Sequence, residues 1–334
     1  MWILSYLTDR YQSVWIDHVY SDFLHNSIGV PQGSNLGPLF FLIFFNDLPT
    51  FISEDIDCYA DDSTIGATAG EATEIGSKLT KDCEQLCTWM KVNRFKLNAG
   101  KTHFMVVGTS ARLQNMEDKL VVEMDGISLK ESEEKCEVLL GVNIKSDLKW
   151  SLQVKELTTK LKTRIAGLEK LRYVMSGSCK NNIVQGVFNS VLCYCLPLFG
   201  GTNQAELNQL QVQQNRAARI VLNYPPRNTR NLMFDKLGWL SVQQLIAYHT
   251  LITVYRIRTS REPEYLSEML LRENYREKIV MNNSKLSLYR NSFVYRGADL
   301  WNKLPSSLRT IQKISSFKKG IKVWVVKSVA RFSD

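Results

Sequence analysis

Two adjacent carboxylates at the end of a short apolar stretch are the residues of this chain best suited to chemistry. Asp61 and Asp62 follow Tyr59 and Ala60, in the order Tyr-Ala-Asp-Asp, and residues 63–66 come next. The pattern predicts a strand, a tight turn and a returning strand; a turn can aim two neighbouring side chains to one side, whereas a strand alternates them. Mg²⁺ takes one or two carboxylates together with substrate phosphates. The pair therefore suits a metal-dependent reaction at a triphosphate, and a solvated turn is the simpler alternative.

Further segments flank this pair on both sides. A Gly- and Pro-rich segment, Gly-Val-Pro-Gln-Gly-Ser-Asn-Leu-Gly-Pro, occupies residues 29–38, and a mainly apolar run follows over residues 39–48. Downstream come Asn-Arg-Phe-Lys-Leu-Asn at residues 93–98, then Lys101, and Leu-Leu-Gly-Val at residues 139–142. In this order and spacing the segments resemble the palm of reverse transcriptases, in particular those of non-LTR retrotransposons such as the jockey-like elements. The combination is much more specific than the Tyr-Ala-Asp-Asp tetrapeptide alone.

The resemblance implies an RNA-directed DNA polymerase, which transfers nucleotides with the help of two divalent ions, Mg²⁺ or Mn²⁺. Asp61 matches the family's metal ligand, and Asp62 matches the neighbouring carboxylate, whose ligation of metal is less direct. Lys101 matches the lysine that neutralises the leaving pyrophosphate, with a surface lysine at a turn as the plainer alternative. The implied partners are an RNA template, a DNA primer and deoxynucleoside triphosphates.

The same resemblance assigns residues that would contact the nucleotide or the template-primer. They are Pro31, Gln32 and Gly33 for the incoming nucleotide and template, Tyr59 and Ala60 for the primer end, and Leu140 and Gly141 for a hairpin that grips the primer. Glycines around Gln32 allow the backbone to approach nucleic acid closely. A plain core strand is the alternative for residues 140–142, and it is compatible with the gripping role.

Part of the family's machinery is expected to lie outside this sequence. The family uses a further aspartate on an earlier palm strand, and we expect Asp9, Asp17 and Asp22 to follow the position of that strand. We also expect the family's fingers and N-terminal endonuclease to lie outside this sequence. We therefore expect the C-terminal portion of a reverse transcriptase, from mid-palm onward, inactive as this fragment. The alternative is a non-catalytic relic of such an element that binds nucleic acid.

Charge is distributed unevenly along the 334 residues. Residues 1–143 contain 11 Lys and Arg against 21 Asp and Glu, whereas residues 144–334 contain 31 against 12, for a net charge of +9. A strongly basic half favours a polyanionic partner, and contacts to phosphates make binding salt-sensitive. The candidate contacts are Lys155, Lys160, Lys162, Arg164, Arg216 and Arg219. A solvated, lysine-rich surface is the alternative.

The hydrophobic periodicity predicts an α+β fold in two domains. Residues 1–145 are expected to form a partial polymerase palm, an antiparallel sheet with helices, and residues 146–334 a mostly helical, basic thumb and C-terminal region. The predicted helices cover residues 38–48, 71–92, 150–171, 203–223 and 240–257. The predicted strands form hairpins at 57–66 and 121–129 and single strands at 102–107 and 138–144.

Three finer expectations concern burial. The apolar run over residues 39–45 is interpreted as a buried core helix, and Gln213, Gln214 and Asn215 are placed on the polar face of their helix. Trp301 lies in the segment Tyr-Arg-Gly-Ala-Asp-Leu-Trp at residues 295–301, which also resembles the C-terminal region of these elements. We assign that segment no chemistry and expect its tryptophan in the core.

Composition argues against membrane-spanning, disulfide-stabilised and zinc-binding classes of protein. The apolar fraction is 44%, and the longest uninterrupted apolar run, residues 39–45, is far shorter than the roughly 20 residues that span a bilayer. No membrane partner is expected, and the interpretation is an intracellular protein of the nucleus or cytoplasm. The seven cysteines form no Cys-x-x-Cys pair. Cys83 and Cys87 with His103 are a weak zinc alternative, and buried free thiols in a reducing compartment are favoured.

Overall fold

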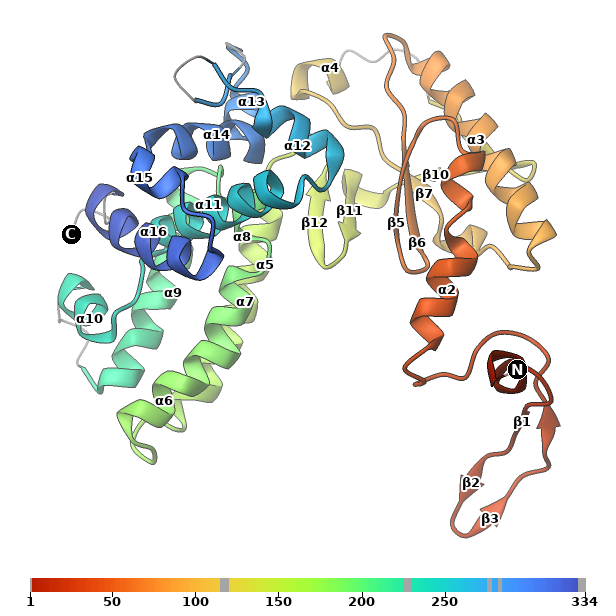
Figure 1. Ribbon diagram of the computed structural model, residues 1–334, viewed down its shortest axis with the longest axis horizontal. Helices are drawn as coiled ribbons and strands as arrows, with labels where there is room; N and C mark the ends of the chain where they lie inside the picture. Colours follow the sequence, from red (N-terminus) through yellow and green to blue (C-terminus); the bar gives the residue numbers. More distant parts are fainter. Residues whose placement is uncertain (1, 115–119, 225–229, 275–277, 282–283, 330–334) are drawn as a thin grey trace. The chain divides into compact units, whose positions relative to one another are not determined.

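The computed structural model describes residues 2–114, 120–224, 230–274, 278–281 and 284–329. The fold is mixed, 57% helical with small, mostly antiparallel sheets (Figure 1). The expected mixture of helices and antiparallel strands is therefore present. Contacts divide the chain into two compact units, residues 1–104 with 114–132 and residues 105–113 with 133–334. Residues 133–145 thus pack with the helical unit.

The first unit combines short strand pairs with helices. Its helical elements are α1 (Trp2–Leu7), α2 (Gly37–Phe45), the 3₁₀ turn η1 (Leu48–Phe51), α3 (Ala72–Val92) and the 3₁₀ turn η2 (Ala99–Lys101). Its antiparallel pairs are β1 (Tyr11–Gln12) with β4 (Leu24–His25), β2 (Trp15–Ile16) with β3 (Val19–Tyr20), β5 (Asp55–Tyr59) with β6 (Asp62–Gly66), and β8 (Glu123–Met124) with β9 (Ile127–Ser128). β7 (His103–Phe104) pairs in parallel with β10 (Lys130–Glu131).

The β5–β6 hairpin packs on an aromatic cluster that includes α3. Ile56 and Ile65 lie opposite each other in the register and contact a cluster centred on Phe45, Leu48 and Trp89. Full burial of an isoleucine side chain contributes about 1.5–3 kcal/mol, and the half-buried Ile56 and Ile65 each contribute a part of that. Polar contacts fix the start of the hairpin as well, because the fully buried Asp82 of α3 accepts hydrogen bonds from the backbone N–H groups of Ser53 (3.0 Å) and Glu54 (2.9 Å). α3 therefore supports the β5–β6 hairpin through both apolar contacts and hydrogen bonds.

The interpretation of residues 39–45 as a buried helix was wrong. The segment is helical as α2, but Leu39, Leu42, Ile43 and Phe44 are exposed, whereas Gly37 and Phe45 are buried. The described elements of this unit cover only the side of α2 that carries Phe45. An all-apolar helix has no sequence signal for which side is covered.

The second unit is mostly helical. It contains α4 (Ser110–Gln114), which ends at the division between the units, η3 (Glu133–Lys135), and the antiparallel pair β11 (Cys136–Leu139) and β12 (Val142–Lys145). The helices that follow are α5 (Ser151–Glu169), α6 (Gly177–Val184), the π-helical η4 (Gln185–Asn189), α7 (Ser190–Cys193), α8 (Leu196–Phe199), α9 (Gln204–Leu222), α10 (Arg230–Leu237), α11 (Val242–Ser260), α12 (Glu264–Leu271), α13 (Ser287–Asn291), α14 (Phe293–Lys303), α15 (Ser306–Arg309) and α16 (Ile314–Ser328).

A buried amide network lies where a polar helix face was expected. Gln213, Gln214 and Asn215 are all buried in α9, which packs against α5, α6, α10 and α11. Gln211 donates to Gln214 at 3.1 Å and to Asn215 at 2.9 Å, and its oxygen accepts from the backbone N–H of Val242 at 2.8 Å. The expectation was wrong because α9 is enclosed by other helices. Gln211, Gln214 and Asn215 are satisfied by one another and by the backbone of residues 240 and 242, whereas Gln213 accepts from the Arg216 guanidinium.

The last helices form a second core around α11. α14 and α16 both pack against α11 (Figure 1). Trp301 is buried beside Phe317, with the Arg258 guanidinium 4.9 Å from its ring centroid. The expected core position of Trp301 is therefore confirmed. Gly297 lets α14 approach α11, because a Cβ there would stand 2.8 Å from Cγ2 of Val254.

The strand predictions differ from the structure in two places. Residues 138–144 are not one strand, because residues 140–141 turn the chain between β11 and β12. Residues 102–107 contain only the two-residue strand β7. The hairpin around Asp125 and Gly126 forms as predicted, with both residues at positive φ. No helix in the described part of the chain is long and apolar enough to cross a membrane.

Candidate functional site

The two carboxylates lie at the tip of the β5–β6 hairpin. Tyr59, the last residue of β5, pairs with Asp62, the first residue of β6, so Ala60 and Asp61 form a two-residue turn. Ala60 has a φ of 54°, in the left-handed region that tight hairpin turns require. Asp61, Asp62 and the ring of Tyr59 are all exposed. The turn presents both carboxylates to solvent.

The donor set of this turn fits a divalent cation that is held by two carboxylates. Among the described residues, none forms a hydrogen bond or ion pair with the side-chain carboxylate of Asp61 or Asp62, so the carboxylate oxygens remain available to a hard cation. Asp57 lies on the same face of the hairpin as Asp62 by register. Within the described ranges, however, no group of three or more His, Cys, Asp or Glu side chains is placed to hold a metal. Further ligands would have to come from phosphate, water or other groups.

The Gly- and Pro-rich segment forms a loop at the start of α2. Ser34 accepts a hydrogen bond from the Tyr6 hydroxyl at 2.5 Å and from the backbone N–H of Gly37 at 3.1 Å, which ties the loop to α1 and α2. Gln32 is exposed, and the neighbouring Gly33 has a φ of 79° with no atom within 4 Å of an added Cβ. The loop therefore presents open backbone at the segment that was assigned to nucleotide and template.

Lys101 lies at the end of the 3₁₀ turn η2. Its backbone N–H donates to the carbonyl of Asn98 at 3.0 Å, and its side chain is exposed. No hydrogen bond or ion pair between described residues joins its ammonium to Asp61 or Asp62. The structure thus places this lysine in the same compact unit as the two carboxylates, without direct contact.

The Leu140–Gly141 segment is the turn of the β11–β12 hairpin, in the other compact unit. Leu139 pairs with Val142, and the two turn residues have φ values of 48° and 78°, which is the two-residue type I′ pattern. Leucine is unusual at a left-handed position. The return strand is tied to α5, because the backbone N–H and the side-chain amide of Asn143 each donate to Gln153 Oε1 at 3.0 Å.

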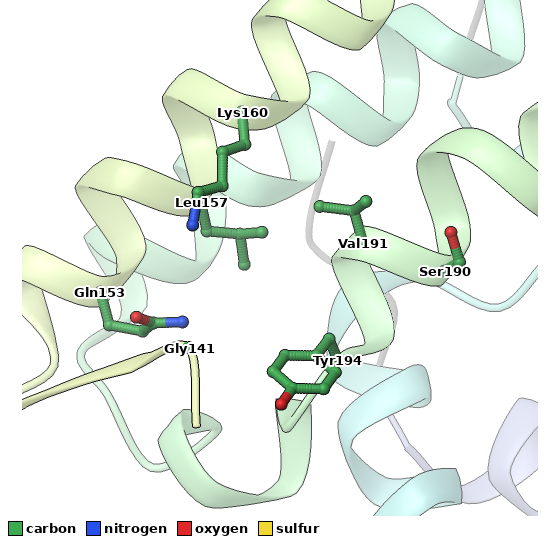
Figure 2. Close-up of a pocket in the computed structure, with 7 residues that line it drawn as sticks. All are labelled: Gly141, Gln153, Leu157, Lys160, Ser190, Val191 and Tyr194. Carbon is green, nitrogen blue, oxygen red and sulfur yellow. The ribbon is translucent and has the colours of Figure 1, made fainter. Parts of the chain in front are cut away.

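A hollow of about 310 Å³ lies beside this turn. Figure 2 shows that α5 lines one wall with Gln153, Leu157 and Lys160, and that the segment from Ser190 to Tyr194 lines the other, with Gly141 at the hairpin. The hydroxyl of Tyr194 donates to the carbonyl of Leu140 at 2.6 Å. The hollow therefore combines apolar side chains (Leu157 and Val191), the Lys160 ammonium and a hairpin turn. These groups suit a sugar-phosphate backbone.

A second hollow continues the first, and we call the two together the α5–α7 groove. The second hollow, of about 520 Å³, shares Lys160 and Val191 with the first and adds Arg164. Of the predicted basic contacts, Lys155, Lys160, Lys162, Arg164 and Arg216 are exposed. Arg219 is half-buried, so its exposure was overestimated. Lys160 and Arg164 are one helical turn apart and line the groove together.

Sequence reasoning missed Tyr194 and Gln153. Tyr194 lies 54 residues after the carbonyl it contacts, and Gln153 holds a hairpin that was predicted as a single strand. A polar residue on the otherwise apolar face of α5 was an available signal for Gln153. No local pattern could have indicated the partner of Tyr194.

The motifs that form this site correspond to a known class of protein. The family model for reverse transcriptase (RNA-dependent DNA polymerase) matches residues 2–161, a span that contains the carboxylate turn, the Gly- and Pro-rich loop, Lys101 and the β11–β12 hairpin. Over that span the chain matches the reverse transcriptase family, and the comparisons support the non-LTR retrotransposon type.

The particular relatives are encoded by mobile elements of Drosophila. The chain is 26% identical over 279 residues to the probable RNA-directed DNA polymerase from transposon BS of Drosophila melanogaster, covering 80% of this chain and 30% of that protein. It is 25% identical over 253 residues to the RNA-directed DNA polymerase from mobile element jockey of the same species, covering 71% and 27%. The chain thus spans less than a third of the length of these relatives. No solved structure matches it.

Proposed function

We propose that this chain is the palm and thumb segment of an RNA-directed DNA polymerase, with residues 1–145 as the partial palm and residues 146–334 as the thumb and C-terminal region. The observation that carries the proposal is the hairpin turn at Ala60 and Asp61, inside the family match, with Asp61 and Asp62 exposed and unpaired among the described residues. RNA template, DNA primer and deoxynucleoside triphosphates are the proposed partners.

The two carboxylates would hold the divalent ions. Mg²⁺ or Mn²⁺, when bound, supplies charge stabilisation to the attacking and leaving oxygens of the phosphoryl transfer. Asp61 and Asp62 contribute the anionic oxygens, and the exposed Tyr59 offers a flat surface for the primer end. Lys101 neutralises the leaving pyrophosphate from its exposed turn. The open loop at Gln32 and Gly33 approaches nucleotide and template.

The β11–β12 hairpin and the α5–α7 groove would hold the nucleic acid. Leu140 and Gly141 lie at the turn that grips the primer, and Lys160 and Arg164 neutralise phosphates along the groove. Their contacts would position the backbone without selecting a sequence. This assignment gives a role to the excess of positive charge in residues 144–334, for which the carboxylate turn offers no explanation.

The alternative is non-catalytic nucleic-acid binding by a relic of such an element. We expect no primer extension from the 334-residue protein alone. Sustained Mg²⁺-dependent incorporation that disappears in Asp61→Ala would contradict this part of the proposal.

Metal binding by the hairpin tests the palm assignment without requiring catalysis. Mn²⁺ binding to the full chain is measured by electron paramagnetic resonance for the wild type and for Asp61→Asn and Asp62→Asn. We expect Asp61→Asn to weaken binding by about tenfold or more, because a hard cation loses a charged ligand, and Asp62→Asn to weaken it less. Asp22→Asn, at an exposed carboxylate outside the hairpin, is the matched control. Equal effects of Asp61→Asn and Asp22→Asn would remove the metal assignment.

A further inference from the structure

We infer that Tyr194 is a positioning residue for the β11–β12 hairpin. We also infer that Arg296 of the C-terminal segment fixes the backbone corner between α7 and α8, from which Tyr194 reaches the hairpin. The inference rests on the proposed role of the hairpin turn in holding the primer. It gives a function to residues 295–301, which have a recognisable sequence and no chemistry of their own.

The hydroxyl contact is the first step. The tip of the hairpin is largely exposed, and Tyr194 reaches it by donating to the Leu140 carbonyl at 2.6 Å. The Tyr194 ring also lies 3.9 Å from the position of a Cβ on Gly141. The side chain of Tyr194 is itself 51% exposed, so its hydroxyl contributes little to core packing. Its contact with the turn is therefore better explained by placement of the hairpin than by stability.

The backbone corner that carries Tyr194 is the second step. Tyr194 follows the last residue of α7 with extended backbone, and Cys195 comes next in the left-handed region with a φ of 50°. α8 begins at once, and its Leu196 and Phe199 are completely buried. The direction of the Tyr194 side chain is thus set by how α8 is held.

Arg296 holds α8, which is the third step. Its guanidinium donates to the carbonyls of Pro197 and Leu198 in α8, and its Nε donates to the carbonyl of Asn291 at 3.0 Å. Gly201 permits this approach, because a Cβ there would lie 2.3 Å from the Asn291 carbonyl oxygen and 2.9 Å from Arg296 Nε. No carboxylate pairs with this cation among the described residues. Its contacts are therefore directed at the backbone of the corner.

The three steps form one path within the second unit, from α14 through α8 and Tyr194 to the hairpin turn. Loss of either side chain should loosen the turn and weaken its hold on a primer terminus. A hydrogen bond between neutral groups has a modest net value, so we expect effects of about three- to tenfold.

The first experiment replaces Tyr194 in the full chain by Phe, which removes only the hydroxyl, and by 4-aminophenylalanine, which restores a donor. Hydrogen exchange is measured at the amides of Gly141 and Val142. We expect exchange about three- to tenfold faster in Tyr194→Phe and near wild type with 4-aminophenylalanine, while the amides of α5 and α9 stay unchanged. Tyr173→Phe, at a tyrosine that is 83% exposed, is the matched control. Unchanged exchange in Tyr194→Phe would overturn the inference.

Burial raises the pKa of the neighbouring Cys195 thiol, and interaction with the Tyr194 side chain lowers it. Cys195→Ala removes that interaction and leaves the bond to Leu140 in place, so it should not change exchange at the turn. If Cys195→Ala accelerated amide exchange at the turn as much as Tyr194→Phe, the change would come from the backbone corner and not from the hydrogen bond to Leu140. That outcome would overturn the proposed role of this bond.

The second experiment measures binding of the full chain to a duplex with a recessed primer 3′ end and to a blunt duplex of the same length. We expect Tyr194→Phe to weaken binding to the recessed end about three- to tenfold and to leave the blunt duplex unchanged. Equal losses on both duplexes would overturn primer positioning. If even the wild type binds neither duplex, the proposed function fails, and the exchange experiment still decides whether Tyr194 holds the turn.

The third experiment tests the path from the C-terminal segment. Arg296→Lys keeps the charge but cannot reach the two α8 carbonyls and Asn291 together, so exchange at Gly141 and Val142 should rise while the melting transition remains cooperative. Arg256→Lys, at an exposed arginine of α11, is the control. A folded Arg296→Lys protein with wild-type exchange at the turn would remove Arg296 from the path.

Discussion

At the scale of single residues, Leu140 occupies a backbone conformation that leucine rarely adopts. With a φ of 48° it takes the first position of a type I′ turn, where asparagine is favoured. Leu140→Asn should therefore stabilise the chain by about 0.5–1 kcal/mol against urea, because the left-handed penalty is reduced. If the leucine side chain serves the primer, the same change weakens binding to a recessed 3′ end. A loss of stability in Leu140→Asn would show that leucine packing outweighs the backbone preference.

Cysteine reactivity is a second residue-scale test of the structure. Burial raises the pKa of the Cys83 and Cys193 thiols to about 11, whereas Cys58 and Cys179 are exposed. Because the thiolate is the reactive form, only about one in a thousand of the Cys83 and Cys193 thiols is reactive at pH 8.

Alkylation with iodoacetamide at pH 8 should thus label Cys58 and Cys179 first and leave Cys83 and Cys193 unlabelled, as read by peptide mass spectrometry. Raising the pH toward 10 should increase labelling of Cys83 and Cys193, since more thiolate forms as the pH approaches their pKa. In guanidinium chloride all seven cysteines should react. Rapid labelling of Cys83 in the folded chain would contradict the packing of α3.

At the scale of elements, the sequence predicted best where one face of an element is buried. α3 and α9 follow the predicted helices closely, because their apolar residues recur at helical spacing, and α9 is capped by Asn203 and Asn223. The β5–β6 hairpin was predicted from a different signal, an apolar stretch that ends at two adjacent carboxylates. Burial was predicted wrongly in two helices. α2 is apolar on all sides, so its sequence does not show which side is exposed, and the amides of α9 are of a residue type that is usually exposed. Burial there depends on neighbours that are distant in sequence.

Helix packing in the second core gives the prediction at this scale. A Cβ on Gly297 would stand 2.8 Å from Val254 Cγ2, whereas a Cβ on Gly167 of α5 meets nothing within 4 Å. Gly297→Ala should therefore destabilise the chain by about 1–3 kcal/mol through overpacking between α11 and α14. Gly167→Ala should instead be neutral or stabilising by up to about 1 kcal/mol, because alanine favours the helix. Urea unfolding of the two variants measures the contrast, and an equal response would mean that α14 can shift away from α11.

At the scale of the whole molecule, sequence and structure contribute different parts of the site. The motifs indicated Asp61, Lys101 and the Leu140–Gly141 turn, and the family match spans all of them. The carboxylates and the turn lie in different compact units, so local sequence could not show what holds each one. The roles of Tyr194 and Arg296 emerge only from contacts between residues 54 and 99 positions apart.

The charge of the second half gives the last prediction. Full-chain binding to a primer-template should weaken steeply with salt, with a log–log slope of roughly −0.7 to −0.9 for each phosphate neutralised. Replacing Lys160 and Arg164 together by glutamine removes two groove cations, and should reduce the slope by about 1.4–1.8 if each contacts one phosphate. The same replacement of Lys322 and Lys327, which are exposed on α16, changes the net charge equally.

The comparison separates a specific groove from a generic basic surface. A groove predicts that the α16 pair retains nearly the wild-type slope, because those lysines do not line the hollows beside α5. A generic surface predicts equal changes for both pairs, because only net charge then matters. Filter binding across a range of salt concentrations measures all three proteins. Equal slopes in the two variants would assign the affinity to overall charge and leave the α5–α7 groove without a role in holding nucleic acid.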